Sequence, residues 1–458
     1  MILHLIYDSF DFKSWIIFFF VFLLLVDMIK NKNPSNFPPG PYVDLIYCLL
    51  AEAYGKGESL ITQSDSFVER PNVPLFHKVF KAIGISMSNG YLWRSHRKFT
   101  AFHLRMFGEG KKSLEHRIQE ECVFLCDAFK TEKGPFNPLA ILSGAVSNTV
   151  ASLIFGQRFE YHDECYQSIL RLDTECVKLM GSPRAQLYNV FPRLLQYLPG
   201  PHQTIFSNYK KITNFLRGEI IKHREDWDSS NPRDLIDNYL TEMEKKKSDP
   251  QAGFNIEGLV ITCLDVIEAG QRPLPLHYAG VFFMIKYPET QRKVQEEIDR
   301  VIGQSRQPCL ADRVNMPYTD AVIHEMQRLG DVVPMGFPKK AGTAVSTILS
   351  SVLHDPNEWE TPDTFNPGHF LTENGQFRKR DAFMPFSSAS CVGEQLARQV
   401  LFLFFTIPAC SNSPSPNAQE RNQFSGRIWF TYAPAPYRMC VLTLGQTKSV
   451  KIRQKMSG

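Results

Sequence analysis

The sequence predicts a mainly α-helical protein with a small β region, preceded by an N-terminal membrane anchor. Helical patterns dominate residues 110–330, whereas strand patterns are confined to residues beyond 340. An uninterrupted apolar run at residues 15–26 precedes a Pro-rich segment near the N-terminus. The 458 residues are 43% hydrophobic and 21% charged, which suits a large folded core and excludes a disordered or collagen-like chain.

The apolar run WIIFFFVFLLLV at residues 15–26 predicts a retained membrane anchor over residues 1–32. Counted from 14 to 29 it has 16 residues, just under the roughly 20 that span a bilayer as a helix. A cleaved signal peptide is the alternative, but neither a basic start nor a small-residue cleavage site accompanies the run. Lys30 and Lys32 follow it and favour a cytosolic body. Residues 33–41 (NPSNFPPGP) then predict a stiff Pro-rich hinge.

Charge and cysteine content exclude several function classes. The net charge of +4 is too small to indicate a nucleic-acid partner. The ten cysteines form no C-x-x-C pair, which argues against a zinc ribbon and against a disulfide scaffold. Their spacing is typical of buried, reduced thiols in a body that faces the cytosol.

Hydrophobic periodicity places the principal elements of the body. Helices are expected at residues 111–130, 204–227, 255–271 and 289–302. Strands are expected at residues 343–352, 427–432 and 437–444, a loop at residues 411–426, and a solvated basic tail at residues 446–458.

One expected helix is apolar on nearly every face. Residues 256–267 carry this pattern, so that helix should lie in the centre of a large domain. Pro273 and Pro275 follow within helical spacing, and a proline inside a helix removes a backbone hydrogen bond. The helix should therefore kink or stop at these prolines.

Several motifs occur in one order along the chain. They are PPGP at 38–41, WRSHR at 93–97, Ala269-Gly270, EMQR at 325–328, FNPGHF at 365–370 and FSSASCVG at 386–393. This ordered set resembles the cytochrome P450 monooxygenases, most closely the microsomal family 2, subfamily J. The resemblance implies a cytochrome P450-like fold over residues 42–445, haem bound through a Cys thiolate, and a place in the endoplasmic reticulum membrane.

The resemblance also implies an activity and partners. Enzymes of this family insert one atom of dioxygen into apolar small molecules, such as arachidonic acid and other fatty acids or xenobiotics. The electrons derive from NADPH and arrive through NADPH-cytochrome P450 reductase. A lipid bilayer is the remaining expected partner.

Cys391 is the expected ligand of the haem iron. It lies just before the helical pattern GEQLARQVLFLFF, and a thiolate before a helix N-terminus is stabilised by the dipole and by free backbone N–H groups. Phe386 and Gly393 flank it in the loop that the family uses to hold haem. The alternative is a buried, inert thiol, as expected for most of the other cysteines.

Three further residues match family positions that hold haem propionates. Trp93 and Arg97 lie one helical turn apart, and their indole N–H and guanidinium groups are good donors to a carboxylate. An ordinary amphipathic surface helix would explain the same pattern. Lys339 stands where the family carries a propionate-binding Arg or His.

Glu325 and Arg328 are three residues apart and can form a charge-assisted pair on one helix face. In the family this pair is structural and locks its helix to a loop, in which His369 stands at the matching place. An exposed surface pair is the alternative.

The sequence departs from the family at its catalytic motifs. After Ala269-Gly270, in the oxygen-binding segment, Arg272 replaces the family's acid and Pro273 its alcohol, so that neither proton-relaying side chain is present. The loop before Cys391 is about two residues short. These changes support a rival hypothesis, a catalytically impaired or haem-free relic that acts as a non-catalytic membrane protein.

The β region should also be incomplete. The chain is shorter than the family between residues 41 and 70, and again after Lys339, where the family has a hairpin. Missing strands would leave sheet edges uncovered.

Overall fold

The computed structural model describes most of the chain from residue 68 onward. The described residues are 68–106, 114–132, 134, 136–271, 274–303, 306–341, 343–387, 391–416, 427–428, 431–432 and 439–443. The expected anchor at 1–32, the hinge at 33–41, the shortened stretch at 41–67 and the tail at 446–458 lie outside them. Within the described residues, no helix combines the length and the hydropathy needed to cross a bilayer.

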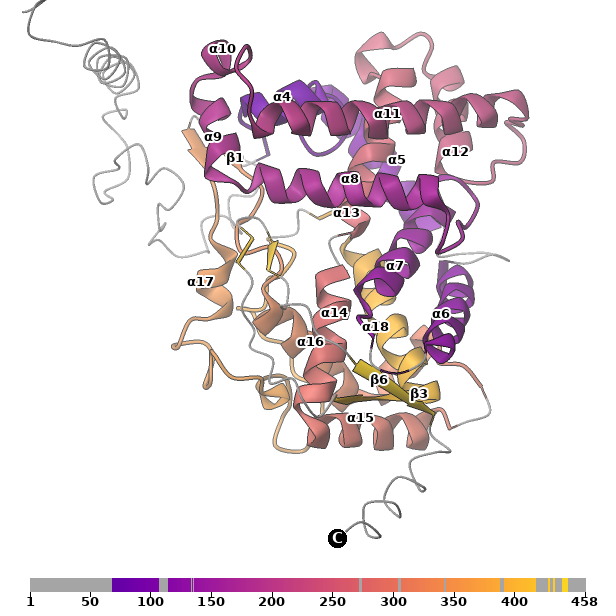
Figure 1. Cartoon of the computed structure of the whole chain (residues 1–458), viewed down its shortest axis with the longest axis vertical. Helices are drawn as coiled ribbons and strands as arrows, with labels where there is room; N and C mark the ends of the chain where they lie inside the picture. The colour runs from indigo at the N-terminus through magenta and orange to yellow at the C-terminus, as the bar shows by residue number, and fades with distance from the viewer. Residues whose placement is uncertain are drawn as a thin grey trace, which may run out of the picture. The chain divides into compact units, whose positions relative to one another are not determined.

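The described part of the chain is mainly helical (Figure 1). Its α-helices are α4 Pro74–Phe80, α5 Gly90–Met106, α6 Leu114–Thr131, α7 Leu139–Ile154, α8 Glu164–Met180, α9 Pro183–Val190, α10 Pro192–Leu195, α11 Pro201–Glu225, α12 Leu235–Lys245, α13 Ile256–Gln271, α14 Leu274–Lys286, α15 Pro288–Val301, α16 Pro317–Gly330, α17 Leu349–Leu353 and α18 Glu394–Ser411. Short 3-10 turns are η3 Pro250–Ala252, η4 Leu310–Asn315 and η5 Pro367–Phe370.

The four helices expected from periodicity are present as α6, α11, α13 and α15. Helix α11 starts three residues earlier than expected, at Pro201, because proline suits the first helical turn, where its missing N–H is not needed. Helix α13 ends at Gln271, and α14 begins at Leu274. The expected break in this helical region is therefore confirmed.

Helix α13 runs through the interior, as its all-round apolar pattern predicts. Its residues from 258 to 268 are all buried. It packs against α7 and α11, and α11 in turn lies alongside α8 (Figure 1). The approach to α7 is close, since a Cβ added at Gly270 would overlap the Val150 side chain. A larger residue at this crossing would displace the Val150 side chain.

Two large apolar clusters make up the core. One joins α6, α14, α16 and α18, and the other joins α8, α11, α12 and α13. Helix α7 contributes to both, through Val146 to the first and Val150 to the second. A small third cluster around Trp359 and Phe370 supports the segment that follows α17.

The described strands form three two-stranded antiparallel pairs. Strands β1 Lys339–Ala341 and β2 Thr343–Val345 make a tight hairpin, so a short hairpin does stand where the sequence suggested a loss. Strand β4 Arg427–Ile428 pairs with β5 Thr431–Tyr432. Strand β3 Asn412–Pro416 pairs with β6 Met439–Thr443, with Asn412 opposite Thr443.

Two expectations for this region were wrong. The strand expected at 343–352 stops at Val345, and α17 follows, because Leu349 and Leu353 lie one helical turn apart and both are buried. The loop expected at 411–426 begins instead with strand β3, which contains Pro414 and Pro416. Its partner β6 follows more than twenty residues later, so local composition could not indicate this pairing.

Candidate functional site

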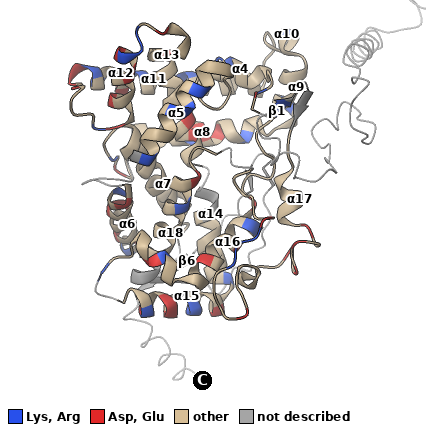
Figure 2. Ribbon diagram, turned by 180° about the vertical axis from the view of Figure 1, so that it is seen from behind, with Lys and Arg blue, Asp and Glu red and all other residues tan. Residues whose placement is uncertain are grey.

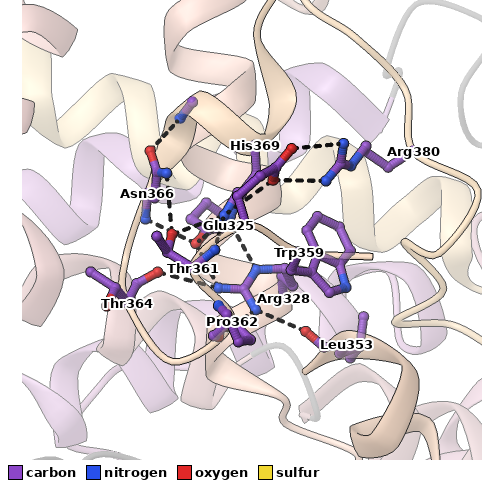
Figure 3. Close-up of polar contacts among 12 residues, drawn as sticks. Glu325, Arg328, Leu353, Trp359, Thr361, Pro362, Thr364, Asn366, His369 and Arg380 are labelled. Carbon is purple, nitrogen blue, oxygen red and sulfur yellow. Dashed lines mark hydrogen bonds and ion pairs between the residues drawn. The ribbon is translucent and has the colours of Figure 1, made fainter. Parts of the chain in front are cut away.

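The end of α16 carries a buried ion pair that joins the helix to the following loop (Figure 3). Arg328 donates from Nε to Glu325 Oε2 and from Nη2 to Glu325 Oε1, both at 2.8 Å. Both side chains are completely excluded from solvent. The alternative of an exposed surface pair is therefore wrong.

The remaining donors of Arg328 bind backbone carbonyls of the loop. Nη1 donates to Leu353 O at 2.8 Å and to Pro362 O at 2.7 Å, and Nη2 donates to Thr364 O at 3.3 Å. Leu353 is the last residue of α17, and Pro362 and Thr364 lie in the loop that follows. One planar guanidinium thus holds the end of α17 and two points of this loop, more than twenty residues away.

His369 completes the cluster from η5. Its Nδ1 lies 3.2 Å from both oxygens of Glu325, while the backbone N–H of Thr361 points at its Nε2 at 3.3 Å. Because Nε2 accepts from that N–H, Nδ1 carries the proton and donates to Glu325. The Asn366 N–H donates to Glu325 Oε1 at 2.9 Å. The sequence motif missed Trp359, whose ring lies 5.0 Å from the Arg328 guanidinium.

A second set of residues forms a cationic cluster of Arg70, Arg97 and Lys339. The backbone of Glu69 pairs with Lys340 of β1, and Arg70 Nη1 donates to Pro338 O at 3.1 Å, which brings Arg70 beside Lys339. Burial and repulsion from Arg97 lower the pKa of Arg70 to about 10, against the attraction of Asp265. Burial lowers the pKa of Lys339, and Arg70 and Arg97 lower it further.

Trp93 and Arg97 lie on α5, with the Arg97 guanidinium 5.4 Å from the centre of the Trp93 ring. Burial lowers the pKa of Arg97, whereas the nearby Cys391 acts in the opposite direction. Arg97 is therefore close both to the other two members of the cationic cluster and to Cys391. This arrangement links two sites that the sequence could only place separately.

Cys391 lies three residues before α18 and its residue surface is exposed. The surrounding protein desolvates the thiol and raises its pKa, and Glu394 raises it further. The backbone N–H groups of Gly393 and Glu394 and the charge of Arg97 oppose this change. Backbone N–H groups at the start of α18 thus face the sulfur.

The loop before Cys391 is tightly bent. Ser387 has a φ of +61°, a left-handed conformation that side-chain-bearing residues rarely adopt, and its N–H donates to Met384 O at 3.0 Å. Phe386 precedes it and lies 5.3 Å from the Arg398 guanidinium of α18. Gly393 O accepts from Ala397 N at 2.8 Å and so begins the first turn of α18.

The expected oxygen-binding segment lies at the end of α13. Ala269 is exposed and Gly270 is partly exposed, although residues 258–268 of the same helix are buried. Among residues 258–271, these two are therefore the ones that are not buried. Arg272 and Pro273 lie outside the described residues.

Asp265, one turn earlier on α13, holds the segment between α4 and α5. It accepts from Ile85 N at 2.7 Å, from Ser86 N at 3.3 Å and from the Ser86 hydroxyl. Burial raises the pKa of Asp265 to about 6, against these hydrogen bonds and against Arg70. The sequence analysis did not single out this tether.

Comparison with known proteins decides what this arrangement is. The family model "Cytochrome P450" matches residues 56–441. The chain belongs to the cytochrome P450 family. It is 43% identical to human cytochrome P450 2J2 and 43% identical to rat cytochrome P450 2J3, in each case over 92% of this chain and 94% of the relative. It is also 43% identical to chicken cytochrome P450 2H2 over 76% of this chain and 74% of that protein.

Membership of the cytochrome P450 family makes this chain a haem-thiolate monooxygenase with a mainly helical fold. The residues present fit that cofactor. Haem offers two carboxylates and one iron. The cationic cluster suits the carboxylates, since it brings three cations together and since the buried Arg70 Nε has no hydrogen-bond partner among the described residues. The thiol of Cys391 suits the iron.

Sequence reasoning missed Arg70 of the cationic cluster. It is a single arginine before a proline, in a stretch without helical or strand periodicity. Its position beside Lys339 depends on a contact across about 270 residues. The one available signal was the basic residue itself, and many arginines in this chain share that signal.

Proposed function

We propose that this protein inserts one oxygen atom from dioxygen into apolar substrates, such as fatty acids and xenobiotics. The electrons come from NADPH and are delivered by NADPH-cytochrome P450 reductase. The observation that carries the proposal is Arg97, which lies close to Cys391 and also to Arg70 and Lys339. In this proposal the catalytic domain covers residues 42–445.

Each site residue then has a role. Trp93, Arg97, Arg70 and Lys339 hold the haem carboxylates, and Cys391 ligates the iron, with Phe386 and Gly393 shaping its loop. Bound haem supplies the iron that activates dioxygen. Ala269 and Gly270 leave room beside it, because neither has a side chain beyond Cβ. Glu325, Arg328 and His369 act at a distance by holding the loop after α17.

A reduced, carbon-monoxide-bound absorption spectrum tests this proposal. The wild-type chain should show the red-shifted band of a thiolate ligand, and Cys391→Ala should lose it. Cys263→Ala is the matched control, since Cys263 is buried in α13 and should leave the band unchanged. A wild-type chain without haem would favour the rival hypothesis of a haem-free relic, which the bent loop at Ser387 and the break after Gln271 support.

The proposed location is the endoplasmic reticulum membrane, with residues 1–32 as anchor, residues 33–41 as hinge and the body in the cytosol. The surface of α9 and α10 supports a membrane-facing side. Five large apolar side chains are exposed there, namely Leu187, Val190, Leu194, Tyr197 and Leu198. The chain has no Asp or Glu between residues 182 and 218, and the two helices show almost no acidic colour in Figure 2. Such a surface suits an anionic bilayer.

Truncation tests the location. Deletion of residues 1–32 should convert carbonate-resistant membrane pelleting into release of much of the protein. The exposed apolar surface should keep a residual, salt-sensitive association, which Leu194→Asp would weaken. A full-length chain that is already soluble would contradict the anchor.

A further inference from the structure

Glu268 is an acidic residue at the edge of the proposed oxygen pocket. It directly precedes Ala269, the residue at which α13 becomes exposed after a buried stretch of eleven residues, 258–268. Its own side chain is buried, with 9% of the residue exposed. A carboxyl group at this place is chemically distinct from the apolar residues that make up most of the helix.

The carboxyl of Glu268 is bonded to a phenol from another helix. The Tyr209 hydroxyl of α11 donates to Glu268 Oε1, and Tyr209 itself is 3% exposed. A tyrosine hydroxyl both donates and accepts, and a carboxyl can carry a proton or release it. The two groups can therefore pass a proton between them within one hydrogen bond.

Further polar side chains lie between Tyr209 and the solvent-exposed face of α8. Asp173 and Cys176 of α8 are buried. Burial raises the pKa of Tyr209 far above its usual range, and Glu268, Asp173 and Cys176 raise it further, so Tyr209 stays protonated and able to donate. Asn208 donates from Nδ2 to the exposed Glu175 at 2.9 Å.

Because Asn208 also bonds Cys176, polar groups extend from the surface of α8 at Glu175 to α13. A route for protons from the surface to α13 matters because the family's own acid and alcohol are replaced in this chain by Arg272 and Pro273. Proline has no hydroxyl, and an arginine stays protonated, so neither can hand on a proton at neutral pH.

We propose that Glu268 and Tyr209 form a proton-carrying pair that supplies the pocket at Ala269-Gly270 in place of the missing acid and alcohol. This inference rests on the proposed monooxygenase function. Glu268 releases the proton of its carboxyl toward the pocket, and the electron pair of the broken O–H bond remains on the carboxylate. The Tyr209 hydroxyl then gives its proton to Glu268 while it takes one from the carboxyl of the neighbouring Asp173. The electron pair of that O–H bond stays on Asp173, which is re-protonated from solvent, so no charge accumulates on the phenol.

Infrared spectroscopy tests the pair without turnover. Spectra of the full chain at acidic minus alkaline pH should contain the C=O stretch of a buried, protonated carboxyl. The buried Asp265 contributes to the same region, because its pKa is raised to about 6. Glu268→Gln should therefore remove one component of the band, and Tyr209→Phe should shift the frequency of that component, because the hydrogen bond to the carbonyl oxygen is lost. Tyr239→Phe is the matched control: Tyr239 is also buried, but its hydroxyl faces His96, at 3.4 Å. It should leave the band unchanged.

Turnover of the haem-loaded enzyme tests the role. Product formed per NADPH should fall by about 10²-fold in Glu268→Gln, the lower end of what acid–base assistance contributes. Glu268→Asp should recover part of this loss, since it keeps a carboxyl, and the solvent isotope effect of the wild type should change in Glu268→Gln. A structural hydrogen bond alone would not give this pattern.

Two results would overturn the proposal. One is an unchanged carboxyl band in Glu268→Gln, which would show that Glu268 holds no exchangeable proton. The other is an unchanged product-to-NADPH ratio in a haem-loaded Glu268→Gln enzyme. A wild-type chain that binds no haem would instead refute the proposed function, and the relay with it, whereas the infrared band would still report the shared proton.

Discussion

Arg328 and Glu325 form a doubly hydrogen-bonded ion pair from which solvent is completely excluded. Burying two charges is costly, and the cost is offset only when every donor and acceptor is used. Here Arg328 also binds three carbonyls and Glu325 also accepts from Asn366 and His369. The pair therefore holds the loop after α17 in one arrangement.

Glu325→Gln should destabilise the protein by about 3–5 kcal/mol, because it leaves the Arg328 charge buried without its counter-charge. Denaturant unfolding measures this change. Glu289→Gln is the control, since Glu289 pairs with Arg292 on the exposed face of α15 and should cost less than about 1 kcal/mol. Equal effects of the two substitutions would contradict the role of burial.

Arg70→Met should accelerate haem loss by about 10- to 100-fold, as expected when a charge-assisted hydrogen bond to a carboxylate is removed. Transfer of haem to an apo-globin acceptor measures the rate. Arg94→Met, an exposed position on α5, should leave the rate near that of the wild type. Arg70→Lys should lie between the two, because it keeps the charge without the planar fork.

His277→Leu should stabilise the protein at mildly acidic pH. Desolvation in the core lowers the pKa of His277 from 6.5 to about 3, and its Nε2 has no hydrogen-bond partner among the described residues. Between pH 6.5 and about pH 3, His277 is protonated in the unfolded chain but not in the folded chain. The free energy of unfolding therefore falls by about 1.4 kcal/mol for each pH unit of acidification. Thermal unfolding of the variant should show a flatter acid limb.

His223→Gln should reduce stability near neutral pH. The variant should also lack the decrease in stability that the wild type shows as the pH rises above neutrality. Burial opposes its charge, but Asp234, the Glu219 carbonyl and Asp237 together raise the pKa of His223 to about 9. The folded state thus holds its proton more tightly than the unfolded state, whose pKa is 6.5. The stabilisation is complete below pH 6.5 and disappears as pH rises through about 9. Urea midpoints across this interval measure it, and identical slopes in both proteins would contradict it.

Sequence patterns predicted the features that depend on residues close together in the chain. The break after Gln271 follows from two prolines, and the pair of Glu325 and Arg328 follows from helical spacing. Residues that depend on distant contacts could not be found in this way. Arg70 reaches Lys339 across most of the chain, and Tyr209 meets Glu268 only because α11 packs on α13. Strand β3 shows the same limit, since its partner strand lies far along the sequence.

Trp359 lies between two guanidinium groups, with Arg328 and Arg380 each 5.0 Å from its ring, and it is 1% exposed (Figure 3). Its indole N–H donates to Val352 O, which fixes the ring in place. An indole in such an electric field emits differently from one in water. Trp359 is one of five tryptophans in the chain. Once the other four are replaced, its fluorescence follows the assembly of the junction of α16, α17 and the loop separately from the unfolding of the rest.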